Sequence, residues 1–212
     1  GFSGGNVLEP TVGSGNFIGL MPTEMVNSSQ WFASEIDPTT SAIAKHLYPD
    51  AQVKTATPFE RAQFPYGKFD LVIGNPPFGA TRLKSTEAAT AALDGWKIHN
   101  FIIGKSALHL RPGGVMAMVV TSRFLDTMDE SSQETRAWLD QNMWFLGAVR
   151  LPNTAFKKNA GTEVTTDIVF FMRPDTELQG KVTPNREWLT LGSVGEVPVN
   201  RYFAQHPELM FG

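Results

Sequence analysis

The stretch from Asn6 to Phe17 reads NVLEPTVGSGNF and guides the interpretation of the whole chain. Its apolar start, Asn6 to Glu9, predicts a β-strand. The segment Pro10 to Gly15 predicts a turn that leads into a short helix ending at Pro22. The glycines of this turn permit positive φ angles and let a ligand approach the backbone closely. The stretch therefore indicates a strand, a ligand-binding turn and a helix in succession.

The remainder of the chain alternates short apolar runs with helical segments, which predicts an α/β fold with a mostly parallel sheet. We expect helices after Asp37-Pro38, between 86 and 110 with a break near Gly95, and from Ser131, which has capping-box spacing to Glu134. The last two strands are expected to form a hairpin that ends the sheet. The strands expected after the first span residues 31–36, 52–56, 69–74, 115–121, 145–151 and 167–172.

The composition excludes several classes of protein. The chain has 212 residues and no cysteine, which rules out disulfide scaffolds, iron–sulfur clusters and thiol catalysis and fits a cytoplasmic location. The net charge of -3 is unlike that of a basic nucleic-acid clamp, so any such contact must come from a local patch or another domain. No apolar run is long enough to cross a membrane, and we interpret the chain as a fragment of a longer polypeptide.

Acidic side chains stand at the ends of the first two predicted strands. Glu9 ends the first strand, where a carboxylate suits a cation such as the amino group of a methionine moiety. Glu35 and Asp37 follow the second strand, where an acid accepts hydrogen bonds from ribose hydroxyls. A carboxylate in the turn would repel a pyrophosphate, so the pattern favours S-adenosylmethionine over a nicotinamide dinucleotide. The alternative is a tight turn with solvated acids.

The most specific motif is Asn75-Pro76-Pro77-Phe78, directly after the buried strand 69–74. The prolines fix φ and provide no N–H donors, so the backbone carbonyls and Asn75 Oδ1 form a rigid set of acceptors. Asn75 Oδ1 and the Pro76 carbonyl would bind both hydrogens of an adenine N6 amine and direct its lone pair at a methyl group. Phe78 would stack on a base taken out of the helix. The alternative is a proline-rich turn with a core phenylalanine.

Other polar and aromatic residues carry weaker expectations. The histidines lack metal-ligand spacing, so we expect no metal and interpret them as surface or capping groups. Asp70 is expected to be structural, and Trp96 and Trp138 to be core residues. The basic residues near the ligand-binding edge either meet phosphates or are solvated. The histidines are His46, His99, His109 and His206, and the basic residues are Arg82, Lys84, Arg150, Lys157 and Lys158.

At these motifs the chain resembles the N6-adenine DNA methyltransferases. The resemblance is carried by residues 9–17 (EPTVGSGNF), 35–38 (EIDP) and 75–79 (NPPFG), in the order of the gamma-type enzymes. It is closest to the methylase domains fused to helicases in large phage and plasmid proteins. That closer resemblance extends over residues 69–79, 151–156, 161–171 and 200–212.

The resemblance implies a Rossmann-like SAM-dependent methyltransferase fold, with a mostly parallel seven-stranded sheet and a terminal antiparallel hairpin. It assigns residues 1–175 to a catalytic domain without its N-terminal wall, and residues 176–212 to an extension leading to a missing domain. It places Glu35 on the ribose and Ile36 on the adenine of the cofactor. The other cofactor residues it implies are Glu9, Pro10, Thr11, Gly13, Gly15, Asn16, Phe17, Asp37, Phe59 and Asn75. The catalytic residues it implies are Asn75, Pro76, Pro77 and Phe78.

The function predicted from the residues and the resemblance together is methyl transfer from SAM to the N6 amine of a flipped adenine in double-stranded DNA. A helicase or recognition domain is the expected partner, and no membrane is involved. Three alternatives remain open at this point. The first is an RNA or protein-amide N-methyltransferase, since the same acceptors suit those amines. The second is a non-catalytic SAM- or DNA-binding module. The third is a nicotinamide dehydrogenase, which has the least support because nothing resembles a hydride-transfer site.

Overall fold

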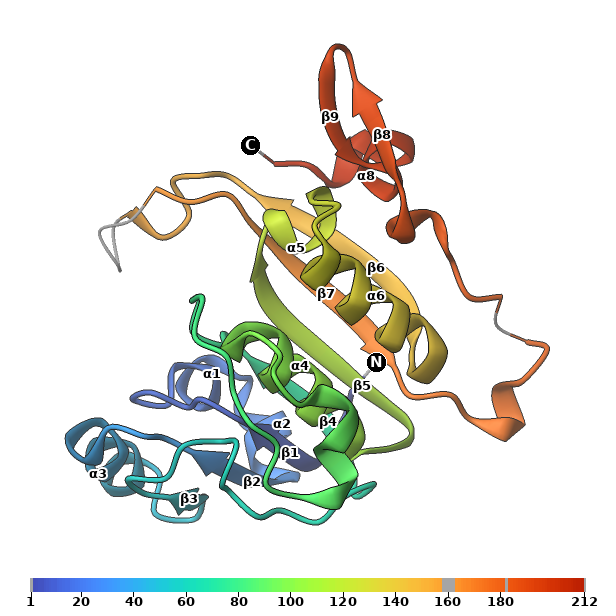
Figure 1. The fold of residues 1–212 in the computed structure, drawn as a ribbon. Helices are drawn as coiled ribbons and strands as arrows, with labels where there is room; N and C mark the ends of the chain where they lie inside the picture. Colours follow the sequence, from blue (N-terminus) through green and yellow to red (C-terminus); the bar gives the residue numbers. More distant parts are fainter. Residues whose placement is uncertain (1, 158–162, 182, 212) are drawn as a thin grey trace.

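The computed structural model of the protein describes residues 2–157, 163–181 and 183–211. Its main element is a seven-stranded sheet with the order β3-β2-β1-β4-β5-β7-β6, in which β7 runs antiparallel to both of its neighbours (Figure 1). The other pairings, β1 with β2 and β4, β2 with β3, and β4 with β5, are parallel. The predicted α/β fold with a terminal antiparallel hairpin is confirmed. The strands are β1 (Gly5–Glu9), β2 (Ser29–Ser34), β3 (Gln52–Lys54), β4 (Phe69–Gly74), β5 (Leu110–Thr121), β6 (Trp144–Leu151) and β7 (Thr166–Met172).

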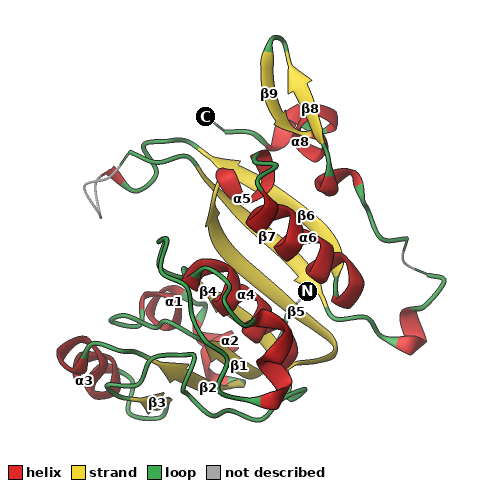
Figure 2. Ribbon diagram, in the orientation of Figure 1, coloured by secondary structure: helices red, strands yellow, loops and turns green. Residues whose placement is uncertain are grey.

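Helices cover both faces of the sheet (Figure 2). Successive residues of a strand point to opposite faces, so Leu8 joins a core beneath α4 and α6 whereas Val7 joins a core with α1 and α3. The helices are α1 (Asn16–Leu20), α2 (Thr23–Asn27), α3 (Pro38–Leu47), α4 (Ile98–His109), α5 (Arg123–Asp126), α6 (Glu130–Asn142) and α8 (Arg201–Gln205). Short 3₁₀ turns are η1 (Ala88–Leu93), η2 (Thr176–Leu178), η3 (Glu187–Leu189) and η4 (Pro207–Leu209). No helix within the described ranges has the length and apolar character needed to cross a membrane.

The described residues after 175 include a second, two-stranded sheet, and part of this segment packs back onto the first sheet. Strands β8 (Leu191–Val194) and β9 (Val197–Asn200) pair antiparallel. Trp188 is buried and stacks on Phe145 with ring centroids 5.1 Å apart, and Phe203 is also fully buried in the main core. Asn200 Nδ2 donates to the carbonyls of Leu125 and Trp188. The division of the chain at residue 175 stays a prediction.

Element boundaries differ from prediction at several places. The expected helix over 86–110 is broken as predicted, because Gly95 adopts a φ of 76° between η1 and α4. The capping box from Ser131 is wrong: Asp129 caps α6 instead, with its side chain accepting from the backbone N–H of Ser132. Strand β5 begins at Leu110 rather than 115, since its first residues pair with Phe69 across a register shift.

Two of the histidines expected at the surface are buried. His99 is 8% exposed, and His109 is fully buried in α4, where its ring stacks on Tyr66 with centroids 4.4 Å apart. Burial lowers the pKa of each of these two histidines to about 4, so both are neutral near pH 7. The interpretation of all four histidines as surface or capping groups is therefore wrong for these two.

Arg150 was expected to meet phosphates or to be solvated, and both expectations are wrong. Its guanidinium is buried and makes two hydrogen bonds to Asp167, at 2.8 and 2.9 Å. A further ion pair of 2.9 Å joins it to Asp126. Lys157 pairs with Glu163, and Lys158 lies outside the described residues.

The structural and core assignments agree with the structure. Asp70 accepts from the backbone N–H of Asn6 at 2.8 Å and from Arg111 Nε at 2.6 Å, so it links β4 to its neighbours. Trp96 is buried and meets the half-buried Trp138 edge to face, with ring centroids 5.9 Å apart.

Candidate cofactor and substrate site

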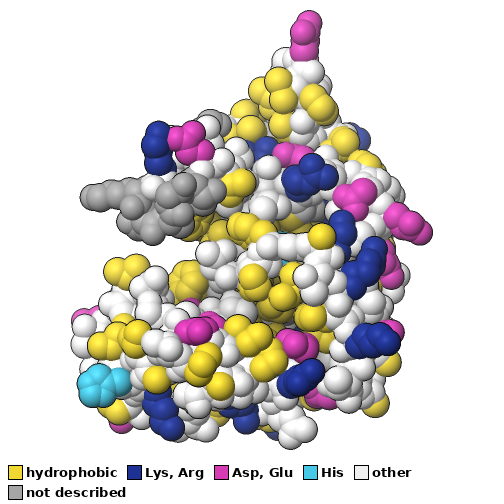
Figure 3. Space-filling view, turned by 60° about the vertical axis from the view of Figure 1, so that its left-hand side comes forward, with side chains coloured by type: hydrophobic (Ala, Val, Ile, Leu, Met, Phe, Trp, Pro, Cys, Tyr) yellow, Lys and Arg dark blue, Asp and Glu magenta, His cyan; other side chains and the backbone are white. Residues whose placement is uncertain are grey.

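The candidate site lies at the carboxyl ends of β1, β2 and β4. The chain runs from β1 to β2 and β3 on one side and resumes at β4 on the other, so the strand order reverses between β1 and β4. Ligands of open α/β sheets bind at such a reversal. Glu9, Glu35 and Asn75 stand at these three strand ends. Figure 3, turned toward this edge, shows hydrophobic side chains gathered along the recess in the middle of the molecule.

Hydrogen bonds hold the turn after β1 against the end of β2. The backbone N–H of Gly13 donates to Glu35 Oε2 at 3.0 Å. Ser34 Oγ donates to the Pro10 carbonyl at 2.7 Å, and the Val12 N–H donates to the Ser34 carbonyl at 3.0 Å. The acid after β2 and the turn after β1 therefore form one unit.

The two glycines of the turn serve different purposes. Both have positive φ angles, 55° at Gly13 and 88° at Gly15. A Cβ on Gly15 would stand 2.3 Å from Tyr48 Cε2, so this glycine allows close packing. A Cβ on Gly13 would meet no atom within 4 Å, so this glycine faces open space. Asn16 and Phe17 follow on α1, which has no side-chain cap.

Glu9 is a buried acid, and one of its carboxyl oxygens accepts no hydrogen bond within the described part of the chain. It is 2% exposed, and its Oε2 has no hydrogen-bond donor there. Burial, and to a lesser degree the negative charge of Glu35, raise the pKa of Glu9 to about 9. A cation placed beside this carboxyl would offset both effects.

A cavity of about 500 Å³ opens beside these strand ends. Its volume is in the range of pockets that hold small molecules and cofactors. Predicted residues that line it are Pro10, Thr11, Glu35, Ile36, Phe59, Asn75 and Pro77. Predicted residues outside its lining are Glu9, Gly13, Gly15, Asn16, Phe17, Asp37, Pro76 and Phe78. Of these, Asp37 caps α3 by accepting from the N–H of Thr40.

Sequence reasoning missed the remaining walls of this cavity, namely Pro58, Glu60, Thr81, Leu83, Ile98 and Ile102. Ile98 and Ile102 are four residues apart in α4 and so lie on one face of the helix, a spacing that is visible in the sequence. Pro58 and Glu60 are the neighbours of Phe59 in the chain. Thr81 and Leu83 belong to an irregular segment without a sequence signal.

A buried lysine stabilises the loop that carries Phe59, one of the residues lining the 500 Å³ cavity. Lys105 is fully buried, and its Nζ donates to the carbonyls of Glu60 and Ala62 at 3.2 and 3.1 Å. The same Nζ lies 2.6 Å from Glu87 Oε1 and 5.3 Å from the centroid of the Phe59 ring. Tyr66 donates to the other oxygen of Glu87 at 2.6 Å. This cluster joins the loop before β4 to the segment after the Asn-Pro-Pro-Phe motif.

The Asn75–Phe78 motif separates two hollows. Asn75 is exposed, its carbonyl accepts from Thr11 Oγ1 at 3.3 Å, and its side-chain amide makes no hydrogen bond within the described ranges. Asn75 and Pro77 line the 500 Å³ cavity, whereas Phe78 and Gly79 line a second hollow of about 230 Å³. Phe78 is 45% exposed and meets the ring of His99 edge to face. The other residues around the second hollow are Lys97, Asn100, Thr121, Arg123, Phe124, Thr127, Asp129 and Ser132.

Comparison with known families identifies the chain. The model of the Eco57I restriction-modification methylase family matches residues 25–155. The chain belongs to the Eco57I methylase family. The matched range contains the acids after β2, the loop with Phe59, the Asn-Pro-Pro-Phe motif and α4.

Solved structures show that this Eco57I-family chain has the fold of SAM-dependent methyltransferases. The type I restriction-modification methyltransferase subunit of Streptococcus thermophilus gives a TM-score of 0.66 at 18% identity, covering 82% of this chain and 41% of that chain. A protein of Vibrio vulnificus, named as the modification subunit of a type I restriction enzyme, gives 0.63 at 19% identity, covering 79% and 40%. A protein of Listeria monocytogenes, named as a class I S-adenosylmethionine-dependent methyltransferase, gives 0.64 at 18% identity, covering 87% and 57%.

The Eco57I-family chain thus spans about 40% of the two restriction-modification subunits. The comparison with curated proteins finds no match.

Proposed function

We propose that the chain transfers a methyl group from S-adenosylmethionine to the exocyclic N6 amine of adenine in DNA. The observation that supports this best is the position of the Asn75–Phe78 motif between two hollows, of which we assign the larger to the cofactor and the smaller to the base. When bound, S-adenosylmethionine supplies the electrophilic methyl group. The proposal applies to a site assembled from β1, β2, β4 and α4.

The residues of the larger cavity, together with Glu9 and the glycine turn after β1, fit this cofactor. Glu9 is a buried carboxyl with an unpartnered oxygen, as expected for a group that meets the ammonium of the methionine moiety. Glu35 stands at the end of β2, where acids bind ribose hydroxyls in doubly wound folds. Ile36 and Phe59 offer apolar surface to an adenine ring. Gly13 leaves open space beside the turn.

Oxygen atoms of the Asn75–Phe78 motif bind the amine that accepts the methyl group. Asn75 Oδ1 and the Pro76 carbonyl accept the two hydrogens of the amine, which favours a pyramidal nitrogen with an available lone pair. The nitrogen gains positive charge as it forms its bond to the methyl carbon while the bond from that carbon to the donor sulfur breaks, so that the thioether S-adenosylhomocysteine leaves, and the two oxygens stabilise the charge on nitrogen. The nitrogen then releases one hydrogen as a proton to solvent water. Phe78 provides a flat surface for a base that has left the helix.

We further propose that recognition of a particular DNA sequence requires a domain beyond these residues, either a recognition domain or a helicase, acting in the cytoplasm, whereas sequence-independent contact with DNA involves this chain itself. The net charge of -3 supports this, since DNA-binding domains are usually basic. The restriction-modification family supports DNA as the substrate, in preference to RNA or a protein amide. The C-terminal extension, residues 176–212, is the proposed connection.

The test is a methylation assay with labelled S-adenosylmethionine and three acceptors: mixed-sequence duplex DNA, RNA and a glutamine-containing peptide. We expect label in DNA alone, found as N6-methyladenine by mass spectrometry of the nucleosides, and none with Asn75→Ala. Label in RNA or peptide alone, or in cytosine, would contradict the proposal. Cofactor binding in calorimetry without transfer to any acceptor would favour a non-catalytic binding module.

A further inference from the structure

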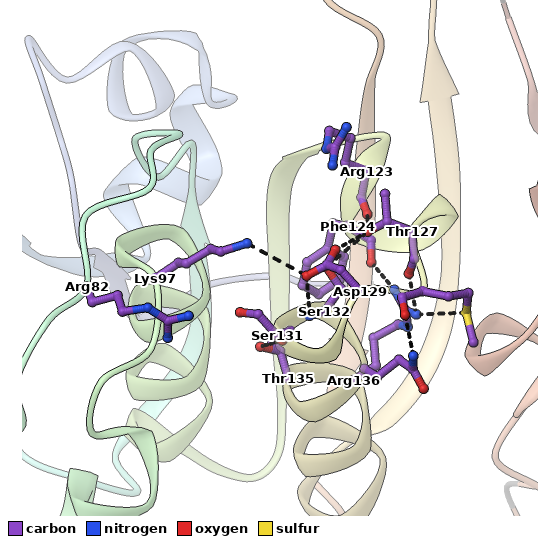
Figure 4. A network of polar contacts seen from close by, with 12 residues as sticks. Arg82, Lys97, Arg123, Phe124, Thr127, Asp129, Ser131, Ser132, Thr135 and Arg136 are labelled. Carbon is purple, nitrogen blue, oxygen red and sulfur yellow. Dashed lines mark hydrogen bonds and ion pairs between the residues drawn. The ribbon is translucent and has the colours of Figure 1, made fainter.

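The mouth of the second hollow is spanned by an ion pair between two separate parts of the fold. Lys97 immediately precedes α4, and Asp129 caps α6. Lys97 Nζ lies 3.7 Å from Asp129 Oδ1, and the two side chains are 38% and 41% exposed. Figure 4 shows Lys97 extending from the α4 side toward Asp129, with Arg82 beside it. The hollow therefore lies between these two helix starts, with a salt bridge at its entrance.

Asp129 shows that this position holds an anion. Its Oδ2 accepts from Thr127 Oγ1 and Ser132 Oγ, each at 2.8 Å, and its Oδ1 accepts from the Ser132 N–H at 3.2 Å. The hydrogen bonds from Ser132, then those from Thr127, lower the pKa of Asp129 to about 2, so the carboxylate is ionised near neutral pH. Hydroxyls, a backbone amide and a lysine also bind phosphate oxygens in nucleic-acid complexes.

Two other residues around the hollow, Arg123 and His99, have polar groups without a partner within the described ranges. Arg123 lines the hollow, is exposed, and takes part in none of the ion pairs within the described ranges. In Figure 4 its guanidinium projects away from the Lys97–Asp129 pair. Inside, His99 is 8% exposed and its Nε2 has no partner there. Its ring lies between Phe78 and Phe124, with centroid distances of 5.3 and 6.0 Å.

We propose that Lys97 and Arg123 bind the phosphodiester backbone of the target DNA strand at the mouth of this hollow, and that Asp129 occupies Lys97 in the free protein and limits this contact. The inference rests on the proposed function. A base that stacks on Phe78 is joined to its phosphates by one sugar, so these phosphates would lie near the entrance of the hollow. The net charge of -3 means that a contact with DNA depends on locally placed cations such as Lys97 and Arg123, since nearby carboxylates repel DNA.

The experiment measures binding of a fluorescent mixed-sequence duplex by anisotropy over a range of salt concentrations. Each phosphate contact that is lost lowers the slope of log K against log salt by about 0.9, and it weakens binding roughly tenfold at about 50 mM salt. We expect this loss for Lys97→Gln and for Arg123→Gln. Lys97→Gln should not unfold the protein, because exposed ion pairs contribute about 0–1 kcal/mol.

Asp129→Asn tests the restraint without removing the helix cap, because asparagine caps as well as aspartate does. We expect binding to tighten about threefold to tenfold in the otherwise unchanged protein. In the Lys97→Gln background the same change should have much less effect, since Asp129 acts through Lys97. The matched control is Lys68→Gln, an exposed lysine before β4 at the opposite edge of the sheet, which should leave the affinity and the slope unchanged.

Three outcomes would overturn the inference: no duplex binding by the unaltered chain, an unchanged salt slope in both Lys97→Gln and Arg123→Gln, or an equal gain from Asp129→Asn with and without Lys97. The methylation assay on the same proteins separates this inference from the proposed function. Adenine methylation with an unchanged salt slope would overturn the inference alone. A lowered slope with no methylation of any DNA would support the inference and count against the proposed function.

Discussion

The backbone N–H of Gly13 donates a 3.0 Å hydrogen bond to Glu35 Oε2, which ties the glycine turn after β1 to the acid after β2. The second oxygen of Glu35 accepts from the N–H of Asp37 at 2.9 Å. The carboxylate proposed to bind the cofactor ribose therefore also sets the shape of the turn proposed to bind its methionine side. Replacement of Glu35 should affect both parts of the cofactor site together.

The first prediction concerns this acid. Glu35→Ala removes the acceptor of the Gly13 N–H and the proposed ribose contact, and charge-assisted hydrogen bonds contribute about 1.5–3 kcal/mol each. We expect S-adenosylmethionine affinity to fall about tenfold to a hundredfold in calorimetry, with a smaller loss for Glu35→Gln, which keeps one acceptor. Glu24→Ala, on the exposed part of α2, is the control. Affinity within twofold of the unaltered protein would reject the assignment.

The second prediction concerns Asn75. Its side-chain amide is not engaged by the described residues, so Asn75→Ala should leave the fold intact and S-adenosylmethionine affinity within a few-fold. Loss of an oxygen that stabilises developing charge lowers kcat by about 10²–10³-fold. Single-turnover methyl transfer measures this step, with Asn142→Ala, exposed on α6, as the control. Retention of full turnover in Asn75→Ala would refute the catalytic role.

The third prediction is a pH dependence that arises from Glu9. Burial first, and the charge of Glu35 second, raise the pKa of Glu9 from 4.5 to about 9, so the folded protein keeps a proton that the unfolded chain has released. The contribution of protonated Glu9 to the free energy of unfolding is therefore fully present below about pH 4.5 and declines as the pH rises to about 9. The decline amounts to a free energy on the order of 5 kcal/mol.

Glu9→Gln removes this ionisable group and keeps its shape. We expect urea denaturation at pH 8 to show greater stability for the variant than for the unaltered protein, and little difference near pH 5. Affinity for S-adenosylmethionine should fall, because the carboxylate for the ammonium is lost. An identical pH profile of unfolding in the two proteins would contradict the assignment of the pKa.

The fourth prediction contrasts the two glycines of the turn. Gly13→Ala places a Cβ in open space at positive φ, which costs about 1 kcal/mol in stability, and the methyl group should weaken cofactor binding. Gly15→Ala places the Cβ 2.3 Å from Tyr48 Cε2, so the loss of stability should be several times larger. Thermal unfolding ranks the two variants, and calorimetry measures cofactor affinity. A larger loss of stability in Gly13→Ala would reverse the argument.

The fifth prediction concerns the buried lysine that supports the Phe59 wall of the 500 Å³ cavity. Lys105→Met leaves Glu87 without its ammonium partner, and breaking such a pair costs about 3–5 kcal/mol. Combining it with Glu87→Gln should recover part of the loss, because neither partner is then left charged alone. Urea denaturation measures all three variants. Additive losses in the double variant would show that the pair does not act as a unit.

Local patterns in the sequence predicted most of the sheet and the residues at the carboxyl ends of its strands. Apolar runs such as residues 69–74 are short and are followed by glycine or proline, which is sufficient to place a buried strand and its end. The same patterns placed Glu9 and Glu35 at the ends of the first two strands and Asn75 directly after the strand over residues 69–74. The walls contributed by Thr81 and Leu83 had no such signal, since they come from an irregular segment.

The wrong expectations concern residues whose surroundings come from distant parts of the chain. His109 was interpreted as a surface or capping group because the histidines lack metal-ligand spacing, yet Tyr66 and three phenylalanines surround its ring. Arg150 was expected either to meet a phosphate or to be solvated, yet Asp126 and Asp167 lie beside its guanidinium. Side-chain type indicates what a residue can bind, and the partners present in the folded chain decide what it does bind.

The sequence by itself determined the order of the elements, the glycine turn and the acceptor-rich corner at Asn75, because backbone conformation there depends on neighbouring residues. Only the tertiary structure decided that the Asn75–Phe78 motif separates two hollows, and that Lys97 meets Asp129 at the entrance to one of them. The physical reason is that hollows and ion pairs need groups from segments far apart in the chain, and their distances are set when the helices pack onto the sheet.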